Sequence, residues 1–148
     1  MKSASIISQL PYAYPFLFVD EISEFSTEGI KGNYTFPVAH PIYEGHFINN
    51  PITPGVILTE CMAQIGVVCL GIVLLNLNSE NTINSEFVMT SSNVEYLKPV
   101  YPGEKVSVES VKRYFRFNKL KCDVIMKDSE GDMVCKGEIA GMIINNNI

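Results

Sequence analysis

The sequence predicts an α+β fold in which a long central helix is wrapped by a curved antiparallel sheet of about six strands. The first observation is that residues 56 to 75 are apolar on nearly every side, so a helix there must be covered all round. The second is that most of the remaining chain is rich in β-branched and aromatic residues and is divided by turn sequences. The length of 148 residues fits a single domain covering residues 1–148.

Two strands are expected before the helix. The segment Phe16–Phe25 is rich in aromatic and β-branched residues, and Ile30–Phe36 alternates between apolar and polar side chains. Glu28 and Gly29 supply a turn between them. Residues 37–54 contain four prolines and two adjacent asparagines, which predict an irregular loop.

The long helix is expected to begin around Pro54, because proline's missing N–H group is not needed in a first helical turn. Thr53 is the predicted N-cap. Between Val56 and Leu75, Glu60 is the single charged residue. The longest run of apolar residues and glycine, Ile65–Leu75, is too short to span a bilayer.

Four strands are expected after the helix. They are Glu86–Val100, Lys105–Phe117, Leu120–Lys127 and Met133–Ile144. Short turn sequences between them favour antiparallel pairing. A single sheet would leave part of the central helix exposed, so we expect two chains to join their sheets edge to edge in a homodimer.

Composition excludes several classes of function. The net charge of −5 argues against a nucleic-acid partner. The four cysteines lack metal-site spacing and are expected to be small buried hydrophobic residues in a reducing compartment. The N-terminal segment is too polar and interrupted for a secretory signal. We therefore expect a cytoplasmic protein without a membrane span.

The stretch from Gly45 to Gln64 is the most informative one for function. His46 lies in the turn-rich loop, and Glu60 lies roughly 9 Å beyond the start of the helix at about 1.5 Å per residue. A carboxylate on a helix that is buried all round is costly unless it is paired or used. An imidazole and a carboxylate can move protons on and off a small acyl substrate, and free N–H groups at the helix start can polarise a carbonyl oxygen.

Other interpretations of these residues stay open. His46 could be a structural loop residue, and Glu60 could face water at the rim of the helix. Gln64 follows Glu60 by four residues and shares its face, so it could orient the carboxylate or hydrogen-bond backbone across a dimer. His40, Glu44 and His46 match no common metal-site spacing, so no metal is expected.

A set of short motifs extends across almost the whole chain. It comprises Leu10-Pro-Tyr-Ala-Tyr-Pro-Phe-Leu-Phe-Val-Asp20, Gly45-His46-Phe47, Pro51, Pro54-Gly55-Val56, Glu60-Cys-Met-Ala-Gln64 and Lys98-Pro-Val-Tyr-Pro-Gly103. In combination these motifs resemble the β-hydroxyacyl-[acyl carrier protein] dehydratases of the hot-dog fold. The resemblance implies an active site at a dimer interface, where His46 of one chain faces Glu60 of the other. It implies acyl carrier protein as a partner, no cofactor, and a homodimer or a trimer of dimers.

The reaction implied by the resemblance is elimination of water from a β-hydroxyacyl thioester to give a trans-2-enoyl thioester, in fatty-acid or related (polyene) chain synthesis. His46 would take the α-proton, and Glu60 would protonate or orient the departing hydroxyl. The N–H group of Gly55 would hydrogen-bond the thioester carbonyl at the positive end of the helix dipole. The implied substrate-binding residues are Gly55, Val56, Phe47 and Gln64.

Two departures from the family pattern suggest a specialised relative. Tyr12-Ala13 replaces the usual His-Arg pair, and Ile48-Asn49 replaces the usual Pro-Gly after Gly-His-Phe. Three alternative functions follow from the same residues. They are a hot-dog thioesterase with Glu60 as base or nucleophile, a dehydratase that also isomerises the double bond, and a non-catalytic acyl-binding subunit of a synthase. Relatives that isomerise typically carry aspartate at the helix position, so Glu60 favours dehydration alone.

Positive charge is unevenly distributed along the chain. Nine of the eleven Lys and Arg residues fall between Lys98 and Lys136. Acyl carrier proteins resemble one another in being acidic, so we expect part of this set to form a positive rim near the substrate entrance. The candidates are Lys98, Lys105, Lys112, Arg113, Arg116, Lys119 and Lys121.

Overall fold

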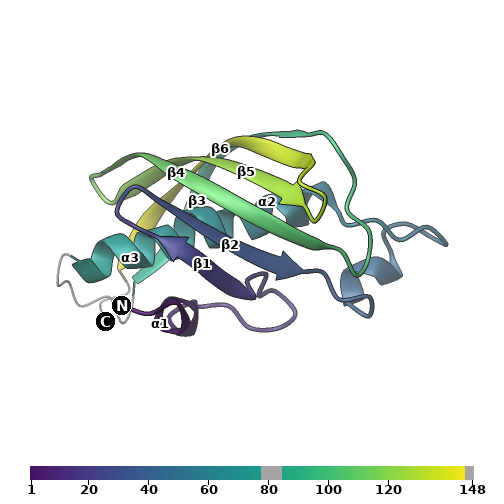
Figure 1. Ribbon diagram of the computed structural model, residues 1–148. Coiled ribbons are helices and arrows are strands. Elements are labelled where there is room, and N and C mark those ends of the chain that lie inside the picture. Colours follow the sequence, from purple (N-terminus) through teal and green to yellow (C-terminus); the bar gives the residue numbers. More distant parts are fainter. Residues whose placement is uncertain (78–84, 146–148) are drawn as a thin grey trace.

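The computed structural model describes residues 1–77 and 85–145, and within them an antiparallel sheet curves around one long helical rod (Figure 1). The sheet has six strands in the order β1-β2-β4-β5-β6-β3, and every neighbouring pair is antiparallel. This confirms the predicted fold class. The strands are β1 (Glu21–Phe25), β2 (Gly29–Thr35), β3 (Ser85–Tyr96), β4 (Lys105–Arg116), β5 (Lys119–Asp128) and β6 (Met133–Asn145).

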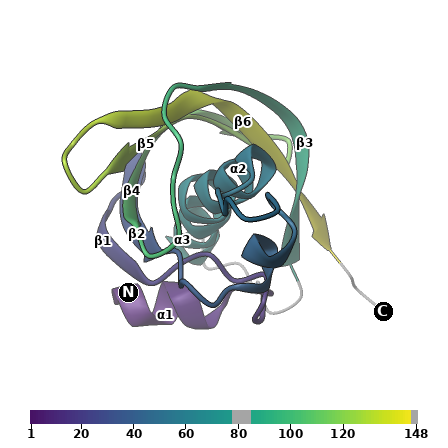
Figure 2. The ribbon, with the colours of Figure 1, turned by 90° about the vertical axis from the view of Figure 1, so that its right-hand side faces the viewer.

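The helical rod forms the centre of the core. It runs through α2 (Gly55–Ala63), η2 (Gln64–Cys69) and α3 (Leu70–Leu77), and Figure 2 shows the sheet wrapping around it. With 23 residues, this helix is long and apolar enough to cross a membrane, but 83% of its most apolar stretch is buried inside the protein. The predicted burial is therefore confirmed for most of the helix. It is wrong for Val56, whose side chain in the first turn is 74% exposed.

The middle of the rod, η2, is a π-helix, which the sequence pattern did not predict. The Ser110 hydroxyl of β4 donates a hydrogen bond of 2.8 Å to the carbonyl of Gly66 inside this segment. A side chain that bonds into the helical ladder is a recognised cause of such irregularity. A β-carbon at position 66 would lie only 3.1 Å from the Ser110 β-carbon, so glycine permits this close approach.

The strand predicted at Phe16–Phe25 is half wrong, because only Glu21–Phe25 joins the sheet. Between 16 and 18 the backbone bonds a side chain instead of a neighbouring strand. The Gln64 amide accepts from the N–H of Phe18 at 2.8 Å and donates to the carbonyl of Phe16 at 3.0 Å. This segment is thereby fixed against the central helix, not against β2.

The start of the helix also differs from expectation. Pro54 occupies the N-cap position, and Thr53 does not cap because its hydroxyl hydrogen-bonds that of Tyr43 at 2.6 Å. The loop predicted over 37–54 contains a short 3-10 helix, η1 (Pro41–Glu44). A further short helix, α1 (Ser3–Ser8), had no clear signal in the sequence.

The predicted burial of the cysteines is confirmed. Cys61, Cys69, Cys122 and Cys135 are free and buried. Burial raises the pKa of the Cys122 thiol to about 11 and that of Cys135 to about 12, so both remain protonated at neutral pH.

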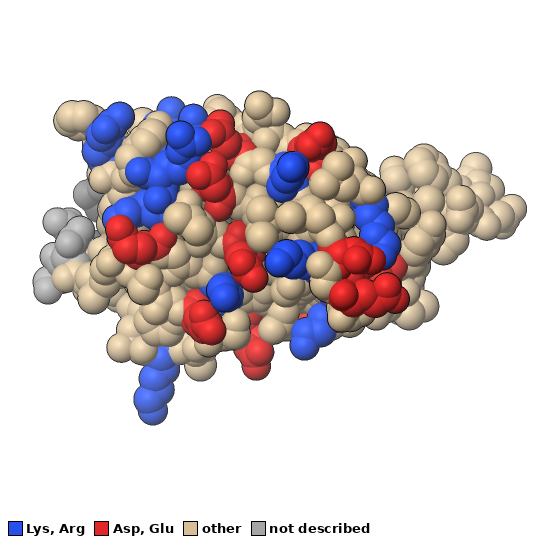
Figure 3. Space-filling model, turned by 45° about the horizontal axis from the view of Figure 1, so that its top comes forward, with Lys and Arg blue, Asp and Glu red and all other residues tan. Residues whose placement is uncertain are grey.

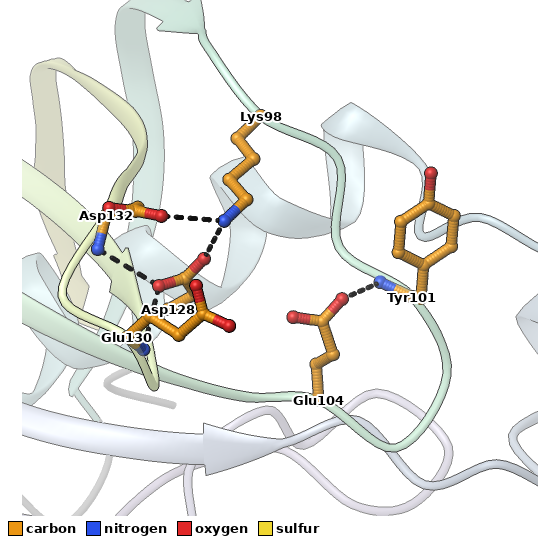
Figure 4. Close-up of polar contacts among 6 residues, drawn as sticks. All are labelled: Lys98, Tyr101, Glu104, Asp128, Glu130 and Asp132. Atoms are coloured by element: carbon orange, nitrogen blue, oxygen red, sulfur yellow. Dashed lines mark hydrogen bonds and ion pairs between the residues drawn. The ribbon is translucent and has the colours of Figure 1, made fainter.

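A polar cluster ties the β5–β6 turn to the segment that follows β3 (Figure 4). The Asp128 side chain is nearly buried and accepts from the Lys98 ammonium at 2.5 Å and from the N–H groups of Glu130 and Asp132 at 3.0 Å. Lys98 also reaches Asp132 at 2.9 Å. The Lys98 hydrogen bond lowers the pKa of the Asp128 carboxyl, against an opposing effect of desolvation. Lys98 therefore stabilises the fold at this position through its bonds to Asp128 and Asp132.

Asp128→Asn is expected to lower the thermal midpoint by several degrees at neutral pH. A carboxyl whose pKa is lower in the folded chain stabilises the fold above its unfolded pKa of about 3.9, and this contribution is lost as pH falls through the folded pKa. The difference between wild type and variant should therefore shrink in strong acid, as followed by circular dichroism. Glu130→Gln is the matched control, because its side chain is exposed and only its backbone N–H bonds Asp128. A difference that is constant with pH would contradict the ion-pair explanation.

Candidate active site

His46 lies in a tight loop after η1, and its ring is held in a defined orientation. Its Nδ1 atom lies 2.9 Å from the carbonyl oxygen of Ile52, and the N–H of Ile52 returns a bond of 2.9 Å to the carbonyl of His46. A carbonyl oxygen can only accept, so Nδ1 of the neutral ring carries the proton. The Nε2 atom therefore holds the free lone pair and is the atom able to take a proton.

Phe47 and the following residues shape the loop around this ring. The Phe47 ring stacks on His46 with centroids 4.0 Å apart and is 53% exposed. Reciprocal backbone bonds join Phe47 and Asn50, at 2.9 and 3.1 Å, and Asn49 adopts a positive φ of 58°. Asparagine tolerates this left-handed conformation better than most residues. This fits its position in the Ile48-Asn49 pair, which replaces the usual Pro-Gly of the family.

The start of α2 presents the backbone groups expected to bind a carbonyl oxygen. Gly55 and Val56 are the first two helical residues, whose N–H groups an α-helix leaves without intrahelical acceptors. The ring of Tyr96, at the end of β3, packs over this point, and a β-carbon at position 55 would lie 3.2 Å from its Cε1 atom. The Tyr96 hydroxyl also bonds that of Thr59. Sequence reasoning did not identify Tyr96 as a neighbour of the helix start.

Glu60 projects from the second turn of α2 and is half-buried, although the sequence predicted a buried carboxylate. The Gln64 amide donates a hydrogen bond of 2.9 Å to its Oε2 atom. Burial raises the pKa of the Glu60 carboxyl, while the bond from Gln64 acts in the opposite direction. Gln64 is itself fully buried and bonds backbone within its own chain, so it fixes the direction of the carboxylate.

A cavity of about 240 Å³ opens beside Glu60. Its apolar walls come from the central helix and from β3 and β6, and the helix residues Glu60, Ala63 and Val67 follow one another on one helical face. Tyr12 and Phe16 of the N-terminal segment also line it. The other lining residues are Val68, Phe87, Val88, Met89, Ile139, Ala140 and Gly141. The cavity thus places one carboxyl group among otherwise largely apolar walls, as is typical of a ligand pocket.

His46 is not among the described residues that line this cavity, and no hydrogen bond joins it to Glu60 in the described chain. The cavity lies along β3, which forms an edge of the sheet. Val88 and Met89 on this strand are 44% and 43% exposed. An unpaired edge with exposed apolar side chains is suited to pairing with a second copy, which could bring its own His46 to Glu60.

Several of the basic residues form ion pairs with acidic neighbours. Figure 3 shows one group of Lys and Arg side chains at the upper left and others scattered over the rest of this face, interspersed with Asp and Glu. Arg113 pairs with Asp123 and Glu138, and Lys121 lies 3.7 Å from Glu138. Lys112 pairs with Glu28 at 2.9 Å. These residues therefore form ion-pair networks on the outer face of the sheet.

The positive rim near the substrate entrance stays a prediction, and within one chain Arg116 and Lys119 lie away from the start of the central helix. The β4–β5 turn between Arg116 and Lys119 lies next to the end of β6, which pairs with the start of β3. The helix start lies at the other end of β3, against Tyr96. The two features are therefore at opposite ends of the sheet. Adjacency along the sequence could not reveal this, because strand direction decides which end each turn occupies.

The FabA-like domain model matches residues 10–140 of the chain. The chain belongs to the FabA-like family. A 3-hydroxyacyl-[acyl-carrier-protein] dehydratase FabZ from Bartonella quintana is 38% identical to this FabA-like protein over 145 residues, covering 94% of this chain and 87% of that protein. The FabZ dehydratase from Sinorhizobium medicae is 37% identical over 147 residues, covering 95% and 88%.

Solved structures confirm the hot-dog fold of this FabA-like protein. The dehydratase heterocomplex ApeI:P from Xenorhabdus doucetiae gives a TM-score of 0.79 at 12% identity, covering 95% of this chain and 91% of that chain. A hypothetical thioesterase from Streptococcus pneumoniae, solved with coenzyme A, gives 0.62 at 15% identity, covering 86% and 88%. Proteins with different reactions share the fold, so the fold alone does not decide between dehydration and thioester hydrolysis.

Proposed function

We propose that the protein is a dehydratase that removes water from β-hydroxyacyl-[acyl carrier protein] thioesters and yields trans-2-enoyl thioesters, in fatty-acid or related acyl-chain biosynthesis. The observation that carries this proposal is Glu60, a carboxylic acid held by Gln64 in an apolar cavity. The named FabZ dehydratases, similar over nearly the full length, support it.

His46 and Gly55 serve the first half of the reaction. The Nε2 atom of His46 takes the α-proton, since Nδ1 is occupied by the carbonyl of Ile52. The thioester oxygen gains negative charge as this proton leaves. The N–H group of Gly55 stabilises that charge because it lies at the positive end of the helix dipole.

Glu60 serves the second half. The electron pair of the broken α C–H bond forms the new C=C bond, the β C–O bond breaks, and the carboxyl proton of Glu60 converts the leaving hydroxyl into water. Burial raises the pKa of Glu60 and so favours the protonated form needed for this step. Val56 and Phe47 are both exposed, and in this proposal they contact the thioester arm.

The proposed enzyme works as a homodimer in which each site combines Glu60 of one chain with His46 of the other. The exposed β3 edge and the separation of His46 from the Glu60 cavity support this assembly. A trimer of dimers, the docking surface for acyl carrier protein and a cytoplasmic location stay predictions.

The protein is expected to convert β-hydroxybutyryl pantetheine thioester into the enoyl product without releasing thiol. Enoyl absorbance and a thiol reagent, followed in the same reaction, measure the two outcomes separately. Thiol release without enoyl formation would instead identify a thioesterase. Neither signal, on short or long acyl chains, would favour a non-catalytic acyl-binding subunit.

A further inference from the structure

Tyr12 lines the cavity that holds Glu60, although sequence reasoning treated it only as a departure from the family pattern. The described residues around this cavity contribute two side chains with polar groups, the Glu60 carboxyl and the Tyr12 phenol, among otherwise apolar walls. Tyr12 comes from the segment between α1 and β1, which passes beside the central helix (Figure 2). A few convergent polar groups in an apolar cavity fix the orientation of a ligand.

The phenol is available as a hydrogen-bond donor. Among the described residues, neither Glu60 nor any other side chain forms a hydrogen bond with the Tyr12 hydroxyl. No fully buried polar side-chain atom of the described residues lacks a partner, so this unbonded hydroxyl is not fully buried. The hydroxyl therefore faces space that a ligand or water can occupy. Burial and the nearby Glu60, Cys69 and Glu86 raise the pKa of Tyr12, so the hydroxyl keeps its proton throughout the neutral range.

The group that must lie in this space is the departing hydroxyl. Glu60 can protonate that oxygen only from hydrogen-bond distance, which brings the oxygen into the cavity that Tyr12 also lines. Negative charge grows on the oxygen while the C–O bond breaks. A fixed donor directed at such an atom stabilises the transition state more than the ground state.

We propose that the Tyr12 hydroxyl donates a hydrogen bond to the departing β-hydroxyl oxygen, so that this oxygen is held between Tyr12 and Glu60 during elimination. The proposal rests on the dehydratase function proposed above. Tyr12 is then a third catalytic residue, and it contributes to the departure of the hydroxyl without contributing to removal of the α-proton.

The test compares two leaving groups on the same thioester. Tyr12→Phe keeps the ring and removes the donor, and it should lower kcat/KM for β-hydroxybutyryl pantetheine by about 100-fold, as expected for the loss of one donor to a developing oxyanion. With β-chlorobutyryl pantetheine, His46 takes the α-proton and chloride leaves as a stable anion without needing a proton. The Tyr12→Phe variant should therefore eliminate chloride from this substrate at the same rate as the wild-type protein.

Tyr14→Phe is the matched control, because it removes a hydroxyl that is exposed in the same segment and should leave both reactions unchanged. Equal losses on both substrates would mean that Tyr12 only shapes the cavity, and would overturn the proposal. An unchanged rate on the hydroxy substrate would overturn it as well. Failure of the dehydratase function itself is distinguishable, because wild-type protein would then form no enoyl product from the hydroxy substrate.

Discussion

His46→Ala is expected to lower kcat for β-hydroxybutyryl thioester by about 10³-fold, the scale on which a positioned general base or acid contributes. Glu60→Gln is expected to cause a loss of similar size. Glutamine keeps the shape of the side chain and can still meet Gln64, but it has no acidic proton for the leaving hydroxyl. Enoyl absorbance in single-turnover and steady-state assays measures both effects.

The double variant is expected to be little worse than either single variant, because one proton is removed and the other delivered in the same elimination. Thermal unfolding should show that the variants remain folded, since His46 and Glu60 are only half-buried. Glu44→Gln is a suitable control for charge, because Glu44 is an exposed acid close to His46 in the chain. Near-normal turnover in either single variant would remove that residue from the mechanism.

The long helix and the strands were predictable because their signals are local. Apolar residues around the whole circumference of 56–75 require burial, and strand alternation with short turns requires antiparallel pairing. The observed strands β2, β4, β5 and β6 differ from the predicted ranges by only a residue at either end. The motif containing His46 and Glu60 was equally visible, since both residues lie in one stretch with distinctive spacing.

The features that could not be predicted depend on contacts between distant parts of the chain. Phe16 and Phe18 look like strand residues, but the Gln64 side chain from the central helix takes their backbone hydrogen bonds. Thr53 has the composition of an N-cap, but Tyr43 binds its hydroxyl. Tyr12 likewise lines the cavity beside Glu60 only because the fold brings these distant parts of the chain together. No local sequence pattern predicts which distant side chain will lie beside a given residue in the fold.

Mixing His46→Ala protein with Glu60→Gln protein, each inactive alone, is expected to restore about a quarter of wild-type activity after complete subunit exchange. Random exchange of equal amounts makes half of the dimers mixed. Each mixed dimer has one site with both residues intact and one site with neither. The recovery should appear only when exchange is allowed, as followed by the mass of differently labelled chains and by enoyl formation.

The expected recovery rests on the proposed division of the site between two chains. Glu60 lies in a cavity along the β3 edge, while His46 lies in a loop outside that cavity. A site contained within one chain would predict no recovery, because each chain would carry one broken site regardless of its partner. Mixing either variant with the double variant is the control, since no intact combination of His46 and Glu60 can then arise. Demonstrated exchange without recovery, or an active monomer in sedimentation, would contradict the shared site.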